Sequence, residues 1–229
     1  PETRIRMPVS LISTDPGERL RHAYGQSFPD WIGFRFGALN RFPDGVAYPA
    51  TPAEINDILA FAERENGMVI PYGGGTSVVG HLDVPDADRP VISLSLERLN
   101  RLTDINPYNR LATFEAGVRG PYLEAQLKTH GYTLGHYPQS FEQSTLGGWV
   151  VTRSSGQQSL YFGRIEDLFA GGSLITAKGP MNFPPCPASA AGPDLRQIVL
   201  GSEGRMGVLA DAQVRISEIP EADDVYGVF

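Results

Sequence analysis

The sequence predicts an α+β fold, and its 229 residues allow either one sizeable core or two small subdomains packed together. Two observations support this fold class. A helical pattern at residues 51–67 runs directly into a short apolar segment, Met68–Ile70, and then into a glycine-rich loop. Four further segments, at 91–96, 99–105, 111–116 and 208–217, have the composition and spacing of strands.

Residues 51–67 carry the strongest helix signal. Thr51 and Glu54 form a capping box, and Pro52 occupies the first helical position. Gly67 is expected to end the helix in a left-handed conformation. The apolar face has helical spacing and consists of Ile55, Ile58, Leu59 and Ala62. The glycine loop therefore follows a helix–strand unit and lies at the strand's carboxyl end, where α/β sheets favour ligands.

The later segments extend the pattern. Val91–Leu96 is expected to be a strand buried on one face, and a helix starting at Gly120 is expected to end near Gly131. Ser144 is the predicted N-cap of a helix whose first turn contains Gly147 and Gly148. Because two glycines are costly inside a helix, about 1 kcal/mol each, they suggest a flat or bulky group near the backbone.

The flanking regions are less regular. Residues 1–46 read as an arm whose aromatic side chains pack onto the body, and residues 180–193 read as irregular. Val225–Phe229 looks like an apolar strand without a partner, so we expect the chain to be cut from a longer protein.

The composition of the chain bears on which partners it can bind and in which compartment it is expected. The net charge is −7 and no run of Lys or Arg compensates for it, which argues against nucleic acid. The sequence has one cysteine, Cys186, and therefore no internal disulfide. A reducing compartment suits it, so we expect a cytoplasmic location, with membrane association left open. No apolar run approaches the length of a membrane span, and the N-terminus lacks a signal-peptide core.

The loop Pro71–Gly80 is suited to binding an anion, because successive glycines let several N–H groups face one concavity. It matches neither familiar phosphate loop. His81 and Leu82 stand where a P-loop needs Lys and then Ser or Thr, and Val78 breaks the dinucleotide-binding spacing of glycines. Taken alone, the loop could equally be a glycine-rich surface turn.

Four segments in order resemble the FAD-binding domain of the vanillyl-alcohol-oxidase/p-cresol-methylhydroxylase superfamily. Pro71–Ser77 is similar to the loop around the FAD pyrophosphate, and Gln139–Gly148 to the segment lining the flavin ring and ribityl chain. Thr152–Ser155 is similar to a third contact segment, and Glu203–Leu209 to the one closing over the adenosine half. The resemblance assigns FAD contacts to these residues: Pro71, Tyr72, Gly73, Gly74, Gly75, Thr76, Ser77, Gln139, Ser140, Ser144, Thr145, Gly147, Gly148, Thr152, Arg153, Ser154, Ser155, Glu203, Gly204, Gly207, Val208 and Leu209.

The same resemblance implies the domain organisation. It predicts a PCMH-type FAD-binding domain at 47–219, made of two packed α/β subdomains at about 47–105 and 106–219. An N-terminal arm at 1–46 precedes it, and residues 220–229 begin a C-terminal cap domain that is absent from this chain.

Within the superfamily the resemblance is strongest to the alkyldihydroxyacetonephosphate synthase family, and it covers about residues 40–219. It is carried by Arg41–Pro49, Pro71–Ser77, Gly135–Gly156, Ile165–Leu168, Gly192–Asp194 and Gly201–Gly204. It implies an enzyme that exchanges the acyl chain of acyl-dihydroxyacetone phosphate for a long-chain alcohol in ether-lipid synthesis. The alternatives are an FAD-dependent oxidase or dehydrogenase of 2-hydroxy acids or alcohols, and a flavin-binding module without activity of its own.

The resemblance also bears on cofactor, partners and catalysis. Residues 71–80 contain no Lys or Arg, so main-chain N–H groups and the Thr76 and Ser77 hydroxyls are expected to bind the pyrophosphate. Thr76 stands where some relatives place a flavin-bonded histidine, which predicts non-covalent FAD. We expect a small-molecule or lipid substrate. Peripheral membrane contact through the missing part and a homodimer stay open. The family's active-site Tyr and histidine-rich loop lie in the cap domain, so no catalytic residue is assigned.

Several candidates have a plainer interpretation. Gly147 and Gly148 could serve close helix packing instead of a ligand, and Arg153 could form a structural ion pair instead of meeting a substrate phosphate. Glu166 and Asp167 are expected to cap or pair structurally. The four histidines, His22, His81, His130 and His136, lack metal-binding spacing, so no metal site is predicted.

Overall fold

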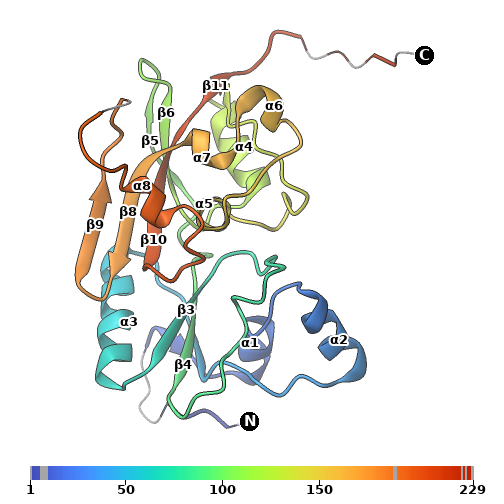
Figure 1. Cartoon of the computed structure of the whole chain (residues 1–229), viewed down its shortest axis with the longest axis vertical. Helices are drawn as coiled ribbons and strands as arrows, with labels where there is room; N and C mark the ends of the chain where they lie inside the picture. Colours follow the sequence, from blue (N-terminus) through green and yellow to red (C-terminus); the bar gives the residue numbers. More distant parts are fainter. Residues whose placement is uncertain (1, 6–9, 188–189, 223, 225, 228–229) are drawn as a thin grey trace.

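The computed structural model describes residues 2–5, 10–187, 190–222, 224 and 226–227. The strands of these residues form a four-stranded, a five-stranded and a two-stranded sheet. Figure 1 shows two lobes, with the four-stranded sheet and α1–α3 below and the five-stranded sheet with the later helices above. The predicted α+β class is confirmed.

The four-stranded sheet has the order β1-β2-β4-β3. Its strands are β1 (Ile12–Ser13), β2 (Gly45–Ala47), β3 (Met68–Tyr72) and β4 (Val91–Ser95). The strands β2 and β3 both run parallel to β4. The expectation that β4 is buried on one face is wrong, because Ser93 and Ser95 are as buried as their apolar neighbours Ile92 and Leu94. As the central parallel strand, β4 is covered on both faces.

Helix α3 (Pro52–Arg64) connects β2 to β3 and begins as predicted, with the Thr51 side chain accepting from the Glu54 amide. The Glu54 carboxylate, however, accepts from the amide of Ala50 and not from that of Thr51, so the capping box is shifted by one residue. The left-handed residue after the helix is Asn66, with φ of 51°, and not Gly67. Asparagine tolerates this conformation, and Gly67 instead lets the carbonyl of Pro90 approach closely.

The five-stranded sheet is antiparallel and has the order β5-β6-β10-β8-β9. Its strands are β5 (Leu102–Asn106), β6 (Leu111–Glu115), β8 (Phe169–Thr176), β9 (Gly179–Phe183) and β10 (Val208–Arg215). Residues 180–183 were expected to be irregular, but they belong to β9, which pairs with β8. A two-stranded sheet joins β7 (Tyr132–Thr133) to β11 (Ser217–Glu218).

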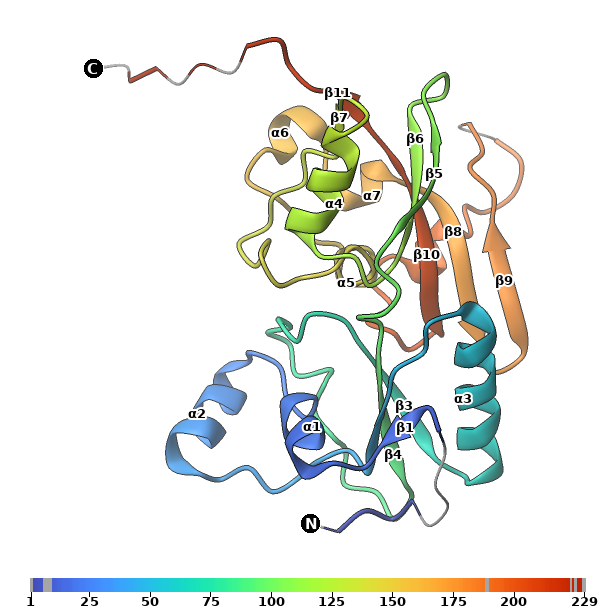
Figure 2. The ribbon, with the colours of Figure 1, turned by 180° about the vertical axis from the view of Figure 1, so that it is seen from behind.

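Helices cover one face of the five-stranded sheet. Figure 2 shows α4, α5, α6 and α7 gathered on the same side of it. Their bounds, with that of α8, are Gly120–Lys128 for α4, Leu146–Thr152 for α5, Ser159–Phe162 for α6, Ile165–Leu168 for α7 and Arg196–Val199 for α8. The core between helices and sheet includes Phe114, Leu127, Trp149 and Phe169.

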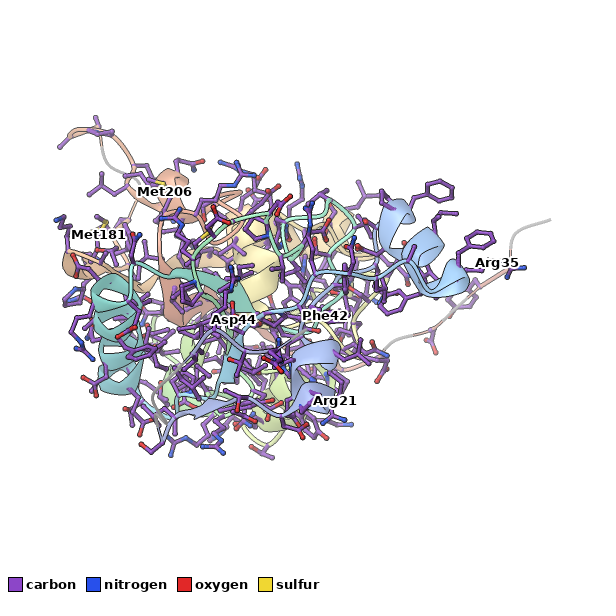
Figure 3. All side chains as sticks on the ribbon, turned by 90° about the horizontal axis from the view of Figure 1, so that it is seen from below. Arg21, Arg35, Phe42, Asp44, Met181 and Met206 are labelled. Atoms are coloured by element: carbon purple, nitrogen blue, oxygen red, sulfur yellow. The ribbon has the colours of Figure 1, made fainter. Side chains whose placement is uncertain are left out.

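The N-terminal region contains α1 (Pro16–Arg21) and α2 (Phe28–Phe36), and β1 and β2 place it in the first sheet. The expectation that its aromatic side chains pack onto the body is wrong for α2. Trp31 is 60% exposed and Phe36 is 71% exposed. In Figure 3 this helix projects sideways from the body, with Arg35 at its outer part.

The predicted domain boundaries at 46/47, 105/106 and 219/220 stay predictions. Between the two large sheets, the chain crosses from β4 to β5 at residues 96–101. The strand-like segment predicted at Val225–Phe229 includes residues outside the described part of the chain. No helix among the described residues combines the length and the apolar character needed to cross a membrane.

Candidate functional site

A cavity lies where the loop after β3 meets the start of α5 and the loop before β10. It is lined by three groups of residues: Pro71–Val79 with His81, Leu82 and Leu96; Pro138, Ser140, Ser144, Thr145, Gly147–Trp149, Val151, Thr152 and Ser154; and Glu203, Gly204, Gly207 and Leu209. The first group follows the carboxyl ends of the parallel strands β3 and β4. All four segments singled out from the sequence therefore contribute to one cavity.

The glycine loop offers main-chain donors to this cavity. Within the described parts of the chain, none of the amide N–H groups of Gly73–Ser77 donates to a backbone carbonyl. All five residues line the cavity, and successive N–H groups without a backbone acceptor are what an anion-binding turn of the phosphate-holding kind requires. Gly75 has a φ of 69°, a conformation that favours glycine.

The loop also touches a second wall of the cavity. A Cβ on Gly74 would lie 2.0 Å from the carbonyl oxygen of Gln143, so only glycine permits this approach. Because Gln143 directly precedes Ser144 and Thr145, the close contact brings together the first two of the four segments that line the cavity.

Helix α5 begins at the cavity. Its N-cap is Thr145 and not Ser144 as predicted, because the Thr145 hydroxyl accepts from the Gly148 amide at 3.2 Å. Ser144 has another role. Its hydroxyl accepts from the Trp149 indole at 2.6 Å and donates to the Ser140 carbonyl at 2.8 Å. These bonds hold the Trp149 ring, which is 2% exposed and lines the cavity.

The two glycines of α5 have different surroundings. A Cβ on Gly147 would lie 2.9 Å from both the Cβ and the carbonyl oxygen of Ala116, which supports the packing interpretation for this residue. A Cβ on Gly148 would meet only the Thr145 hydroxyl, at 3.2 Å. Both line the cavity, but Gly148 is the one whose missing side chain leaves space.

His81 lies between the loop after β3 and the loop before β10. Its Nδ1 lies 3.1 Å from the Ser77 hydroxyl and 4.0 Å from the Glu203 carboxylate. Burial lowers the pKa of His81, and the neighbouring Glu203 opposes this effect. No Lys or Arg is among the described residues that line the cavity. An anion bound there therefore meets no Lys or Arg charge and relies on main-chain, hydroxyl and His81 N–H donors.

Of residues 153–155, which follow α5, only Ser154 lines the cavity. Ser154 lines the cavity and lies 2.7 Å from Nε2 of the buried His136. Arg153 turns away, because its guanidinium pairs with Glu166 at 2.7 Å and also donates to Gln197. The Ser155 hydroxyl accepts from Arg164 at 3.0 Å. Glu166 and Asp167 pair and cap as expected, with Asp167 accepting from the Arg164 amide at 2.9 Å.

Most residues predicted to contact FAD line the cavity. Those that do not are Gln139, Arg153, Ser155 and Val208. Lining residues that were not predicted from the sequence are Val78, Val79, His81, Leu82, Leu96, Pro138, Trp149 and Val151. Leu96 ends the strand predicted at Val91–Leu96, but only the structure shows that this strand, β4, pairs with β3 beside the glycine-rich loop. No group of three or more His, Cys, Asp or Glu side chains among the described residues is placed to hold a metal ion.

The arrangement fits FAD. The amides at Gly73–Ser77, which have no backbone acceptor among the described residues, suit a pyrophosphate, and the apolar lining residues Trp149, Val151 and Leu209 suit a large flat ring. The hydroxyls of Ser140, Thr145 and Ser154 lie on the same cavity and suit the polar atoms of such a cofactor.

Known proteins support this interpretation. The chain is 41% identical over 212 residues to "Alkyldihydroxyacetonephosphate synthase" of Caenorhabditis elegans, an alignment that covers 92% of the chain and 36% of that protein. It is 34% identical over 204 residues to "Uncharacterized FAD-linked oxidoreductase YgcU" of Escherichia coli K12, covering 88% of the chain and 41% of that protein. The chain thus spans less than half the length of these relatives.

A solved structure matches in fold as well. The chain is similar to an alkyldihydroxyacetonephosphate synthase structure with a TM-score of 0.87 and 33% identity, covering 95% of the chain and 40% of that structure. The model of the family described as "FAD binding domain" matches residues 43–181. This range contains three of the four segments that line the cavity. The chain therefore belongs to the FAD binding domain family, and FAD is its cofactor.

Proposed function

We propose that this chain forms the FAD site of an alkyldihydroxyacetonephosphate synthase, which exchanges the acyl chain of acyl-dihydroxyacetone phosphate for a long-chain alcohol. The observation that carries the proposal is the meeting of four separate segments at one cavity with a row of free amides. The likeness to proteins named alkyldihydroxyacetonephosphate synthase supports the choice of reaction.

Each wall of the cavity has a role in this proposal. The amides of Gly73–Ser77 hold the pyrophosphate, and the Ser77 hydroxyl, beside His81, adds a further polar contact. Trp149 and Gly148 lie where a ring can approach the first turn of α5. Bound FAD supplies the reactive flavin ring, while the chain binds and orients it. The acid and base groups for the substrate are proposed to come from sequence outside these 229 residues.

The cofactor is proposed to be held without a covalent bond, because Thr76 offers a hydroxyl where a histidine would be needed. Acid precipitation of the FAD-loaded chain tests this point. All of the FAD is expected in the supernatant, and yellow flavin that stays with the precipitated protein contradicts the proposal.

A second candidate is an FAD-linked oxidoreductase that acts on 2-hydroxy acids or alcohols. It is favoured by the 34% identity to a protein named as an FAD-linked oxidoreductase. Since the same fold supports different reactions, the cavity alone does not decide between the two.

Anaerobic mixing of the complete protein with each substrate separates them. Ether formation from acyl-dihydroxyacetone phosphate and a long-chain alcohol, with oxidised flavin at the end, is the result that the synthase proposal predicts. Bleaching of the flavin by a 2-hydroxy acid, without ether formation, identifies the oxidoreductase instead.

A further inference from the structure

A hydrogen bond between His136 and Ser154 determines how the Ser154 hydroxyl can meet a ligand in the cavity. His136 is 0% exposed, and its ring packs against Trp149 with centroids 5.0 Å apart. Its Nε2 lies 2.7 Å from the Ser154 hydroxyl oxygen. No hydrogen-bond partner among the described residues reaches its Nδ1. Ser154 lines the cavity and His136 does not, so the histidine stands behind the serine.

The unpartnered nitrogen decides which tautomer is present. If Nδ1 carried the proton, a buried N–H donor would remain unpaired, at a cost of about 1–3 kcal/mol. If Nε2 carries it, only an acceptor nitrogen stays unpaired, and the N–H donates to Ser154 across 2.7 Å. Buried unpaired donors are rarer in proteins than under-satisfied acceptors. The Nε2–H tautomer is therefore favoured.

With this tautomer, the Ser154 hydroxyl can act as a donor towards the cavity. Its oxygen accepts from His136, so its own hydrogen is free for an acceptor on the cavity side. Two other hydroxyls along the wall differ, since Thr152 donates to the Gly148 carbonyl at 2.8 Å and Ser144 to the Ser140 carbonyl at 2.8 Å. We propose that Ser154 donates a hydrogen bond to an acceptor atom of bound FAD, and that His136 is the positioning residue that fixes this direction.

Protonation supports the arrangement. Burial lowers the pKa of His136 to about 4, so the imidazole is neutral at pH 7 and has one N–H to donate. The proposal rests on FAD binding in this cavity. It adds a hydrogen bond from Ser154 to the cofactor. His136, which does not itself line the cavity, sets the direction of that bond.

The tautomer can be measured in the unmodified protein. Nitrogen-15 NMR of the histidine side chains at pH 7 is expected to show a protonated Nε2 and an unprotonated Nδ1 for His136. A protonated Nδ1 overturns the proposal, because Ser154 would then donate to the histidine and not to the cofactor. This measurement needs no variant and does not depend on FAD.

Binding measurements test the contact itself. Because a typical hydrogen bond contributes about 0.5–1.5 kcal/mol, Ser154→Ala is expected to weaken FAD binding about three- to tenfold in a fluorescence titration. The matched control is Ser159→Ala, because Ser159 lies outside the cavity lining and its hydroxyl accepts from the Gly156 amide. The control should bind FAD within twofold of wild type. An unchanged affinity in Ser154→Ala overturns the proposal.

A double variant tests whether His136 acts through Ser154. His136→Gln keeps an N–H donor of similar reach and is expected to retain most of the affinity. His136→Phe removes the donor and should weaken binding, but it should add nothing in the Ser154→Ala background. A further loss in that background contradicts the positioning role. If wild-type protein does not bind FAD at all, the proposed FAD site fails, whatever the tautomer result.

Discussion

The guanidinium of Arg153 donates to the carboxylate of Glu166 across 2.7 Å between Nη1 and Oε2. Arg153 is the left-handed C-cap of α5, with φ of 51°, and Glu166 lies in α7. The same guanidinium reaches the Leu200 carbonyl at 3.3 Å and the side chain of Gln197. Arg153 thus joins α5, α7 and α8 instead of pointing into the cavity.

This geometry predicts a stabilising role for Arg153. Arg153→Gln and Glu166→Gln are each expected to lower the free energy of unfolding by about 1–2 kcal/mol, since the pair is charged but partly exposed. A double-mutant cycle by urea denaturation should give a coupling of about 0.5–1 kcal/mol. If Arg153 instead contacts the cofactor, Glu166→Gln will leave stability unchanged, and Arg153→Gln will lower FAD affinity alone.

The two glycines of α5 should respond differently to alanine. Gly147→Ala places a Cβ 2.9 Å from Ala116, so we expect a loss of about 1–3 kcal/mol in unfolding free energy. Gly148→Ala meets little protein and gains helix propensity, so stability should stay or rise by up to about 1 kcal/mol.

FAD affinity gives the second half of this comparison. The added methyl of Gly148→Ala occupies cavity space, and we expect binding about tenfold weaker or worse. Calorimetry for stability and fluorescence titration for FAD measure both quantities in each variant. Full FAD affinity in Gly148→Ala is incompatible with a ring or chain lying against α5.

His136 predicts a dependence of stability on pH. Burial lowers the folded-state pKa from 6.5 to about 4, so the unfolded chain binds the proton first as pH falls. The stability that depends on a neutral His136 is fully present above about pH 6.5 and is lost towards pH 4. The unfolding free energy should therefore fall by roughly 2 kcal/mol between pH 7 and pH 5.

The comparison of wild type with His136→Gln isolates this contribution in urea unfolding at several pH values. Asp83, whose pKa burial and Asp30 raise to about 6, acts with the opposite sign and is present in both proteins. As pH falls from 7 to 5, the unfolding free energy of wild type should therefore decrease by roughly 2 kcal/mol more than that of His136→Gln. A constant difference across this range argues against a buried neutral histidine.

The two tryptophans report on different places. Trp31 on α2 is 60% exposed, whereas Trp149 is 2% exposed and lines the cavity. Trp31→Phe leaves Trp149 as the only tryptophan, so the remaining emission should be blue-shifted and strongly quenched by FAD. Emission from Trp149 that ignores bound FAD would place the cofactor elsewhere.

Much of the site could be predicted because its residues have local reasons for their identity. The glycines of the loop after β3 are required by a positive φ and by the close approach of Gln143, and such needs are visible as consecutive glycines. The order of the four segments then resembled a known family. Helix α3 could be predicted for the same reason, since a capping threonine, a proline and an apolar face all indicate a helix at this place.

Other features depend on tertiary neighbours that the sequence does not display. Thr145 and Ser144 are both good caps, and the choice of Thr145 follows from the bond between Ser144 and Trp149. Arg153 lies in a segment predicted to contact FAD, yet its guanidinium pairs with Glu166 and the residue does not line the cavity. The role of His81 is set by Ser77 and by the distant Glu203. The exposure of α2 shows that aromatic content alone does not indicate burial.

In the proposed site, the amides of Gly73–Ser77, which donate to no backbone carbonyl among the described residues, hold the pyrophosphate of non-covalent FAD. Proton–nitrogen correlation NMR of the chain, titrated with FAD and separately with riboflavin, tests it most directly, because riboflavin lacks the pyrophosphate. These five amide signals are expected to shift with FAD and to stay in place with riboflavin. Amide signals of Gly73–Ser77 that are unmoved by bound FAD would contradict it.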